Sequence, residues 1–314
     1  MGRRRTRLCA PNVVAGAPDR AMRPYPPIMQ SSEVFERVGV VGCGLMGAGI
    51  AEVAARSGCS VVVVEADEGA AKAGRSRIER SLETAVRRGK LAAEEASVVL
   101  DRLTVVADVG ALADRQLVVE AVPEVADLKV DTFRRLDAVV EAPDAVLASN
   151  TSSIPIMKLA MATRRPEQVL GLHFFNPVPV LPLVELVTSL LTGDETARAA
   201  EEFASGPLGK HVIRSQDRAG FIVNALLIPY LLSAIRMLES GFATAEDIDT
   251  GMVQGCAHPM GPLALTDLIG LDTTMAVAQS LYEEFKEPLY APPPLLSRMV
   301  DAGLLGRKTG RGFY

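Results

Sequence analysis

The sequence predicts an α/β domain built on a mostly parallel sheet, followed by an all-α domain. From Arg37 onward, short apolar runs alternate with longer segments of helical periodicity, which is typical of parallel strands joined by crossover helices. After about Gln216 the strand pattern stops and only helical periodicity remains. We therefore expect a disordered extension over residues 1–35, an α/β domain over residues 36–216 and a helical domain over residues 217–314.

The N-terminal extension differs in composition from the rest of the chain. It is rich in arginine and then in proline, and it shows no periodicity, as expected of a disordered segment. Asp19 is its only acid before Glu33, as in transit peptides, but the segment lacks an amphipathic helix and the apolar stretch of a secretory signal. We expect a dispensable extension, consistent with translation that starts upstream of Met22 or Met29.

Each predicted element follows from the spacing of its apolar residues. The strand segments are short and apolar, as strands covered on both faces must be, and residues 68–88 form an amphipathic helix rich in arginine and glutamate. The predicted strands span residues 38–43, 60–65, 103–106, 116–121, 145–148, 169–173 and 183–188. The helices between and after them span 45–57, 68–88, 125–140 and 194–205. In the helical domain we expect helices at residues 219–238, 245–252, 272–285 and 294–301.

Composition and apolar patterning exclude some classes of protein. The formal net charge of -5 provides no basic field, so we expect no nucleic-acid partner. Polar residues and Pro229 interrupt the longest apolar run, residues 221–238, which therefore predicts a buried core or interface helix and no membrane association. The four cysteines are Cys9, Cys43, Cys59 and Cys256, and they include no CxxC pair. We therefore expect no metal site and no disulfide scaffold, and we expect the protein in the reducing cytoplasm.

A glycine-rich turn lies between the first predicted strand and the first predicted helix. Gly42, Gly44 and Gly47 match the G-x-G-x-x-G pattern of dinucleotide-binding turns, with Leu45 and Met46 before the third glycine. Gly42 permits the tight turn, Gly44 lets pyrophosphate oxygens approach the backbone, and Gly47 lets the helix pack closely on the strand. The helix N-terminus adds amide donors and partial positive charge. This context predicts a Rossmann-type domain that binds a dinucleotide, with a ligand-free tight turn as the alternative.

Glu65 ends the second predicted strand, 21 residues after Gly44. A carboxylate at this place accepts hydrogen bonds from both ribose hydroxyls and repels the 2′-phosphate of NADP. The sequence therefore favours NAD. Asp67 is an alternative acid, although Glu65 is nearer the end of the strand.

A histidine and a glutamate are candidates for the chemistry. Oxidation of an alcohol requires a base for the hydroxyl proton, and His173 ends a predicted strand, where open α/β sheets bind ligands. His211 precedes a short strand and His258 lies in a loop of the helical domain. Glu185 stands alone in an apolar strand, and if the proline-rich segment doubles the chain back, its carboxylate accepts from the His173 imidazole. The alternative is an edge-strand glutamate that faces water and a loop histidine.

Two other polar features lie in apolar surroundings. Residues 149–153, Ser-Asn-Thr-Ser-Ser, follow a predicted strand and offer hydroxyl and amide donors, or only cap a helix. Asn224 places an amide within an apolar helix, and a buried amide requires a partner, either another helix or a ligand oxygen.

Together these features resemble the 3-hydroxyacyl-CoA dehydrogenase family, most closely its short bacterial 3-hydroxybutyryl-CoA members. The resemblance covers about residues 38–314. It rests on eight blocks in order: GCGLMGAGIA from Gly42, VEAV from Val119, ASNTSS from Ala148, HFFNPVPV from His173, GFIVN from Gly220, PMGP from Pro259, GLDT from Gly270 and KTGRGFY from Lys308.

The resemblance implies roles for the residues at matching positions. The histidine of the HFFNP block is the catalytic base in such enzymes and the glutamate twelve positions later is its partner, which here means His173 and Glu185. Ser152 and Asn224 would lie beside the reacting oxygen of the substrate. The other matches are cofactor contacts at Glu124, Lys129, Ser152, Asn176 and Lys308, and coenzyme A contacts at Ser81 and Arg88.

Two positions depart from the family pattern. Arg88 stands where a lysine is common, which keeps the charge for a phosphate but changes the geometry. Pro182 also replaces a common lysine, so the shape of the loop before the Glu185 strand is left open.

The resemblance therefore implies an oxidoreductase that uses NAD to interconvert (S)-3-hydroxyacyl-CoA and 3-oxoacyl-CoA, with 3-hydroxybutyryl-CoA and acetoacetyl-CoA as the expected short-chain pair. One alternative is a dehydrogenase of a carrier-protein-bound or free β-hydroxy acid. Another is a structural NAD-binding protein, which need not have retained His173, Glu185, Ser152 and Asn224. Family relatives dimerise through the helical domain, so the resemblance also implies a homodimer.

Overall fold

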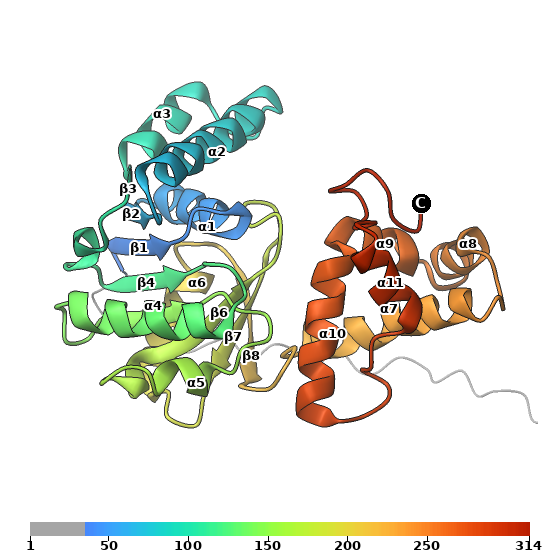
Figure 1. Cartoon of the computed structure of the whole chain (residues 1–314). Coiled ribbons are helices and arrows are strands. Elements are labelled where there is room, and N and C mark those ends of the chain that lie inside the picture. Colours follow the sequence, from blue (N-terminus) through green and yellow to red (C-terminus); the bar gives the residue numbers. More distant parts are fainter. Residues whose placement is uncertain (1–34) are drawn as a thin grey trace, which may run out of the picture. The chain divides into compact units, whose positions relative to one another are not determined.

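The computed structural model describes residues 35–314. The predicted disorder over residues 1–35 concerns residues outside this range, except for Phe35, which is buried and packs edge-on against Phe203 with ring centroids 5.3 Å apart. Within the described part, one sheet and its helices are followed by a purely helical region, so the predicted fold class is confirmed (Figure 1).

The sheet has eight strands in the order β3-β2-β1-β4-β5-β6-β7-β8. Every neighbouring pair is parallel except β6 and β7, which are antiparallel because the proline-rich segment between them reverses the chain. The expectation of a mostly parallel sheet is confirmed. The strands are β1 (Arg37–Val41), β2 (Ser60–Val64), β3 (Leu103–Val106), β4 (Leu117–Glu120), β5 (Val146–Ser149), β6 (Val169–Phe174), β7 (Leu183–Thr188) and β8 (His211–Gln216).

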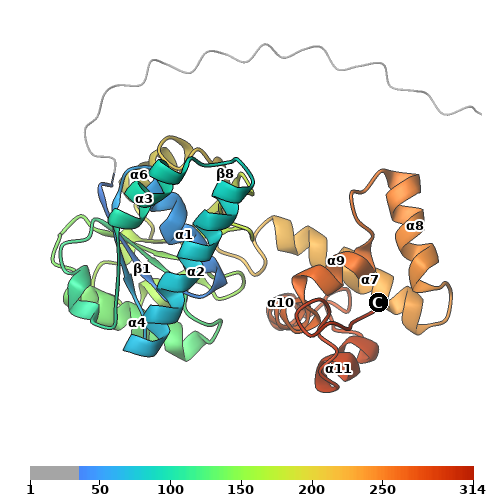
Figure 2. The ribbon, with the colours of Figure 1, turned by 90° about the horizontal axis from the view of Figure 1, so that it is seen from above.

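Helices cover both faces of the sheet (Figures 1 and 2). One apolar cluster joins the strands to α1, α2, α3 and α6, and a second joins them to α4 and α5. These helices are α1 (Leu45–Arg56), α2 (Glu68–Arg87), α3 (Ala93–Asp101), α4 (Ala126–Val139), α5 (Ile156–Ala160) and α6 (Asp194–Ser205), with short 3-10 turns at Val109–Leu112 and Pro166–Gln168.

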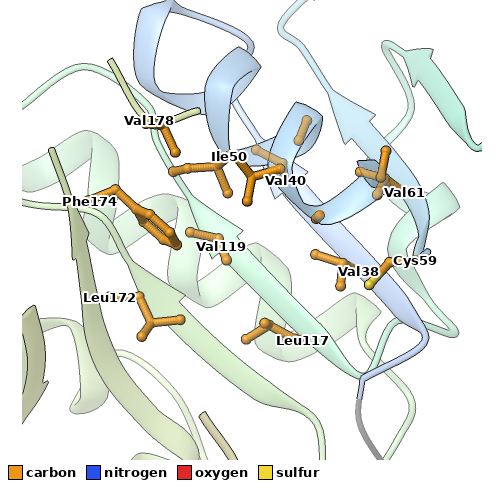
Figure 3. Packing of buried hydrophobic residues seen from close by; sticks show 14 of the residues in the cluster. Val38, Val40, Ile50, Cys59, Val61, Leu117, Val119, Leu172, Phe174 and Val178 are labelled. Atoms are coloured by element: carbon orange, nitrogen blue, oxygen red, sulfur yellow. The ribbon is translucent and has the colours of Figure 1, made fainter. Parts of the chain in front are cut away.

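The larger cluster is mainly aliphatic, with Phe35, Phe174 and Phe203 as aromatic members, in keeping with an aromatic content of 4%. Figure 3 shows side chains of β1, β4 and β6 gathered beneath Ile50 of α1, among them Val40, Val119 and Phe174. Because β4, β5 and β6 are buried on both faces, their polar side chains appear only at or next to their carboxyl ends. The core therefore fixes the carboxyl edge of the sheet, where the candidate site lies.

The region after Gln216 contains only helices among the described residues. They are α7 (Val223–Glu239), α8 (Ala245–Cys256), α9 (Pro262–Ile269), α10 (Leu271–Phe285) and α11 (Pro294–Asp301), and they enclose a third apolar cluster. The start of α7 is later than predicted because Gly220 and Phe221 have φ of 74° and 48°, which a helix cannot contain. Over residues 35–314, no helix combines the length and apolarity needed to cross a bilayer.

Candidate active site

The glycine turn connects β1 to α1. The geometry of the turn gives a different reason for a glycine at each of its three positions. Gly42 has φ of 87°, and a Cβ on Gly47 would lie 1.8 Å from the Gly42 carbonyl oxygen, so neither position accepts a side chain. A Cβ on Gly44 would meet nothing within 4 Å. The space beside Gly44 is therefore open to a ligand at the N-terminus of α1.

A cavity of about 800 Å³ adjoins this turn. Its lining is largely apolar and includes Glu65 at the end of β2. The Glu65 carboxylate accepts hydrogen bonds from the backbone amides of Cys43, at 2.5 Å, and Ala66, at 3.2 Å. Asp67 instead caps α2 by accepting from the amide of Ala70 at 2.8 Å. Of the two acids considered from the sequence, Glu65 is the one that faces the cavity.

His173 and Glu185 lie directly opposite each other on the antiparallel strands β6 and β7. His173 Nδ1 is 2.6 Å from Glu185 Oε2, and the two side chains are 6% and 0% exposed. In the neutral imidazole, a hydrogen bond to the carboxylate keeps the proton on Nδ1 and leaves Nε2 with its lone pair. The contact expected from the sequence is present, and it sets the histidine in the tautomer that a base requires.

Glu185 also receives donors from the helical region. Its Oε1 accepts from the backbone amides of Ile222 and Val223, at 3.0 and 2.9 Å. All of the carboxylate's partners are thus supplied by the protein, as a buried charge requires.

Ser152 lies on the other side of the imidazole. Ser152, His173 and Glu185 therefore form a row of side chains, which we call the His173 row. Ser152 Oγ is 3.1 Å from His173 Nε2, and Ser152 lies in the loop after β5. The neighbouring Asn150 accepts from the backbone amide of Phe174 at 2.9 Å, which ties this loop to the end of β6. The rings of Phe175 and Phe221 pack against the imidazole, with centroids 4.7 and 5.5 Å away.

Asn224 lies in the first turn of α7, next to the amides that bind Glu185. The residue is partly buried, and its side-chain amide has no hydrogen-bond partner among residues 35–314. The side-chain amide is therefore open to a ligand or to solvent, and the role of Asn224 beside the reacting oxygen stays a prediction.

Glu124 receives the loop that carries Ser152. Its Oε1 accepts from the amides of Ser152 and Ser153, at 3.0 and 3.2 Å, and from the hydroxyls of Thr151 and Ser153. Burial acts to raise the pKa of Glu124, but the charge of Lys129 and these hydrogen bonds outweigh it and lower the pKa below its ordinary value. Glu124 is therefore ionised at neutral pH.

Comparison with known proteins fits this geometry. Residues 37–218 match the family model of the 3-hydroxyacyl-CoA dehydrogenase NAD binding domain, and residues 220–314 match that of the C-terminal domain. The chain belongs to the 3-hydroxyacyl-CoA dehydrogenase family. It is an NAD-dependent dehydrogenase, and NAD is its dinucleotide, as the sequence predicted.

Individual relatives align with this chain over most of their length. A 3-hydroxybutyryl-CoA dehydrogenase of Mycobacterium tuberculosis is 62% identical over 283 residues, which are 90% of this chain and 99% of the relative. The mitochondrial hydroxyacyl-coenzyme A dehydrogenase of Homo sapiens is 41% identical, with 90% and 91% of the two chains covered. The crystal structure of (S)-3-hydroxybutyryl-CoA dehydrogenase from Ralstonia eutropha is 44% identical and has a TM-score of 0.85, covering 89% of this chain and 98% of that one.

The dinucleotide half of this family member fits NAD. Gly44 leaves the backbone accessible, while Leu45 and Met46 line the cavity together with Glu65. These residues would hold the pyrophosphate and the adenosine ribose.

Several positions implied by the family resemblance lie away from the His173 row. Asn176 is exposed just after β6, and Lys308 pairs with Asp272 in the helical region. Ser81 is partly buried in α2, and Arg88 is exposed at the C-terminus of that helix. No hydrogen bond within the described part of the chain joins these four side chains to His173, Ser152 or Glu185, so their roles stay predictions.

Lys129, a cofactor contact by the family resemblance, is buried and contacts Glu120 in this structure. Its side chain is only 1% exposed, and its Nζ donates to Glu120 Oε1 at 2.6 Å. Glu120 was not singled out as a candidate, although it has the same signal as Glu185, a lone carboxylate in an apolar strand. Ser149, which donates to Glu120 Oε2 at 2.6 Å, was likewise considered only as part of a polar loop.

Proposed function

We propose that this dehydrogenase interconverts (S)-3-hydroxyacyl-CoA and 3-oxoacyl-CoA, with 3-hydroxybutyryl-CoA and acetoacetyl-CoA as its substrate pair. The observation that carries the proposal is the row of Ser152, His173 and Glu185, joined by contacts of 3.1 and 2.6 Å. Such a row is suited to moving a proton at an alcohol oxygen. The M. tuberculosis and R. eutropha relatives are 3-hydroxybutyryl-CoA dehydrogenases, which supports the acyl-CoA substrate.

The proposed mechanism assigns one task to each side chain. Bound NAD supplies the hydride acceptor. Ser152 and Asn224 orient the C3 hydroxyl of the substrate, and His173 Nε2 takes the hydroxyl proton as the ketone forms. Glu185 holds the imidazole by Nδ1 and stabilises the imidazolium that results. In the reverse direction, protonated His173 returns the proton to the same oxygen.

Steady-state kinetics test the substrate proposal. We expect acetoacetyl-CoA to be reduced with NADH faster than longer 3-oxoacyl-CoA thioesters of up to sixteen acyl carbons. Free acetoacetate and acetoacetyl thioesters of acyl carrier protein are the comparison substrates. Higher kcat/KM with either of these than with acetoacetyl-CoA would overturn the proposal and favour a free-acid or carrier-protein dehydrogenase.

Glu65 is expected to decide between the two nicotinamide cofactors. Replacing Glu65 by serine removes the carboxylate at the rim of the cavity, so the Kd of NADH should rise, by about tenfold for the loss of charged hydrogen bonds. The Kd of NADPH should fall at the same time, because the repulsion of a 2′-phosphate is gone. Fluorescence titration of both cofactors measures this. Asp67→Ser is the matched control and should leave the NADH to NADPH ratio unchanged; equal binding of both cofactors by the unmodified protein would refute the role.

We also propose a homodimer formed through the helical region and a cytoplasmic location. Supporting the dimer, α7 and the residues after it expose apolar side chains, with Leu226 73% and Phe242 79% exposed. Light scattering at micromolar concentration should give twice the chain mass, and Leu226→Glu should shift the mass toward that of the monomer.

The free thiols of Cys43, Cys59 and Cys256 support the proposed cytoplasmic location, which is a reducing compartment. Activity found mainly in a secreted fraction would contradict this location.

A further inference from the structure

A buried charged cluster lies behind the Ser152 loop. We call it the Lys129 cluster, and it consists of Glu120, Ser149 and Lys129 together with Glu124 at its edge. Glu120 and Ser149 end the adjacent strands β4 and β5 and are 0% exposed, while Lys129 reaches them from α4. The mechanism proposed above assigns no task to Glu120, Ser149 or Lys129.

The contacts of the cluster form a continuous path to the His173 row. Lys129 Nζ donates to Glu120 Oε1 at 2.6 Å and lies 3.3 Å from Glu124 Oε2. The other oxygen of Glu124 accepts from the amides of Ser152 and Ser153. Ser152 Oγ then contacts His173 Nε2 at 3.1 Å.

A second path leaves the cluster through Ser149. Its hydroxyl donates to Glu120 Oε2 at 2.6 Å and accepts from the amide of Thr151 at 3.2 Å. Glu120 Oε1 also accepts from the amide of Val122 at 2.7 Å. Glu124 and Ser149 therefore hold the loop after β5 in addition to Asn150, and both of them contact the Glu120–Lys129 pair.

Burial of this pair is costly. Removing two charges from water carries a large desolvation cost, and replacing such a pair by well-packed apolar side chains of similar volume often leaves a protein equally stable or more so. The pair is thus weak evidence for a role in stability, whereas a fully hydrogen-bonded buried pair fixes geometry. A direct contact of Lys129 with NAD fits poorly, because its Nζ already donates to Glu120 and to the Val122 carbonyl oxygen and its side chain is 1% exposed.

We propose that Glu120 and Lys129 are positioning residues that hold Glu124 and Ser149, and through them keep the Ser152 hydroxyl against His173 Nε2. The effect on turnover rests on the proposed function, since it acts through Ser152 and His173. The effect on the loop does not, because the hydrogen bonds exist in the protein alone.

Hydrogen exchange of the protein without ligands tests the loop directly. We expect Lys129→Met to increase the amide exchange rates of residues 151–153 by about tenfold or more, because the Glu124 carboxylate loses its cation. Ser149→Ala keeps both charges of the pair and should give the same direction of change if Lys129→Met does not fold. Arg134→Met removes an exposed cation from the same helix and is the matched control. Unchanged exchange of the loop in folded Ser149→Ala or Lys129→Met protein would overturn the proposal.

A double-mutant cycle tests the consequence for catalysis. Lys129→Met and Ser149→Ala should each lower kcat for acetoacetyl-CoA reduction by up to about 10²-fold, the usual cost of displacing a catalytic group by about 1 Å. Their effect should vanish when Ser152 is already alanine, because the displaced group is gone. The Kd of NADH should stay within about twofold. An equal loss of kcat in the Ser152→Ala background, or a weakened NADH Kd with unchanged kcat, would reject positioning.

The two readouts separate failure of this proposal from failure of the proposed function. If the unmodified protein does not reduce acetoacetyl-CoA, the proposed substrate is wrong, and hydrogen exchange alone then decides the role of the cluster.

Discussion

Replacing His173 by glutamine is expected to lower kcat for acetoacetyl-CoA reduction by about 10²- to 10⁴-fold, the usual contribution of one acid-base group. Glutamine fills much of the imidazole's space and can hydrogen-bond to Glu185, but it cannot take or return a proton at neutral pH. NADH binding should be unchanged, because the cavity beside the glycine turn does not include His173. Stopped-flow and steady-state rates, together with NADH fluorescence titration, measure the two effects.

His211→Gln is the matched control for this replacement. His211 is an exposed histidine at the start of β8, so its replacement should leave kcat and the NADH Kd unaltered. Turnover of His173→Gln within about threefold of the unmodified protein would reject His173 as the proton-transferring group.

Glu185→Gln is expected to reduce both turnover and stability. The carboxylate accepts from His173 Nδ1 and from the amides of Ile222 and Val223, all in a fully buried place. With the amide oxygen toward Nδ1, the amide NH2 faces the N–H donors of Ile222 and Val223 and a buried donor is left without an acceptor. With the NH2 toward Nδ1, the imidazole must move its proton to Nε2 to accept from it, and Nε2 then loses the lone pair that a base needs. The loss of correct imidazole orientation should lower kcat by about 10²- to 10⁴-fold. An unsatisfied buried donor should lower the free energy of unfolding by about 1–3 kcal/mol.

Urea denaturation and the pH dependence of kcat measure these two losses. Glu201→Gln removes a partly exposed carboxylate that pairs with the exposed Arg214 and should change the free energy of unfolding by less than about 1 kcal/mol. If Glu185→Gln instead retained both its stability and its turnover, the carboxylate would not be orienting His173.

The fold was predictable because its strongest signals are local. Valine-rich strands alternate with helices, and the glycine turn marks where the first strand passes into the first helix. The sequence predicted the reversal between β6 and β7 only conditionally, because a proline-rich loop does not determine the register of the two strands that it joins. The apolar spacing did not predict helices α3, α5 and α9. Helix α5 has five residues, α9 has eight and follows Pro-Met-Gly, which is typical of a loop, and α3 has only two buried side chains.

The site was predictable where one side chain conflicts with its surroundings. Glu185 in an apolar strand required a partner, and His173 opposite it supplies one. Glu120 has the same signal, but its partner Lys129 lies in the next helix, and no local spacing identifies that pair. The depth of Lys129 also depends on how α4 packs on the sheet, which no sequence pattern specifies.

Glu185 also limits how far this enzyme can be treated as two interchangeable modules. The family models meet between residues 218 and 220, just before the two amides that bind Glu185 Oε1. A chimera that keeps the dinucleotide half and takes its helical half from a distant relative would carry every glycine of the turn and both members of the histidine–glutamate pair. It would still need the foreign segment to present two backbone N–H groups at the same place. Successful exchange of halves between relatives is therefore governed by the backbone of residues 220–223 and less by the identity of their side chains.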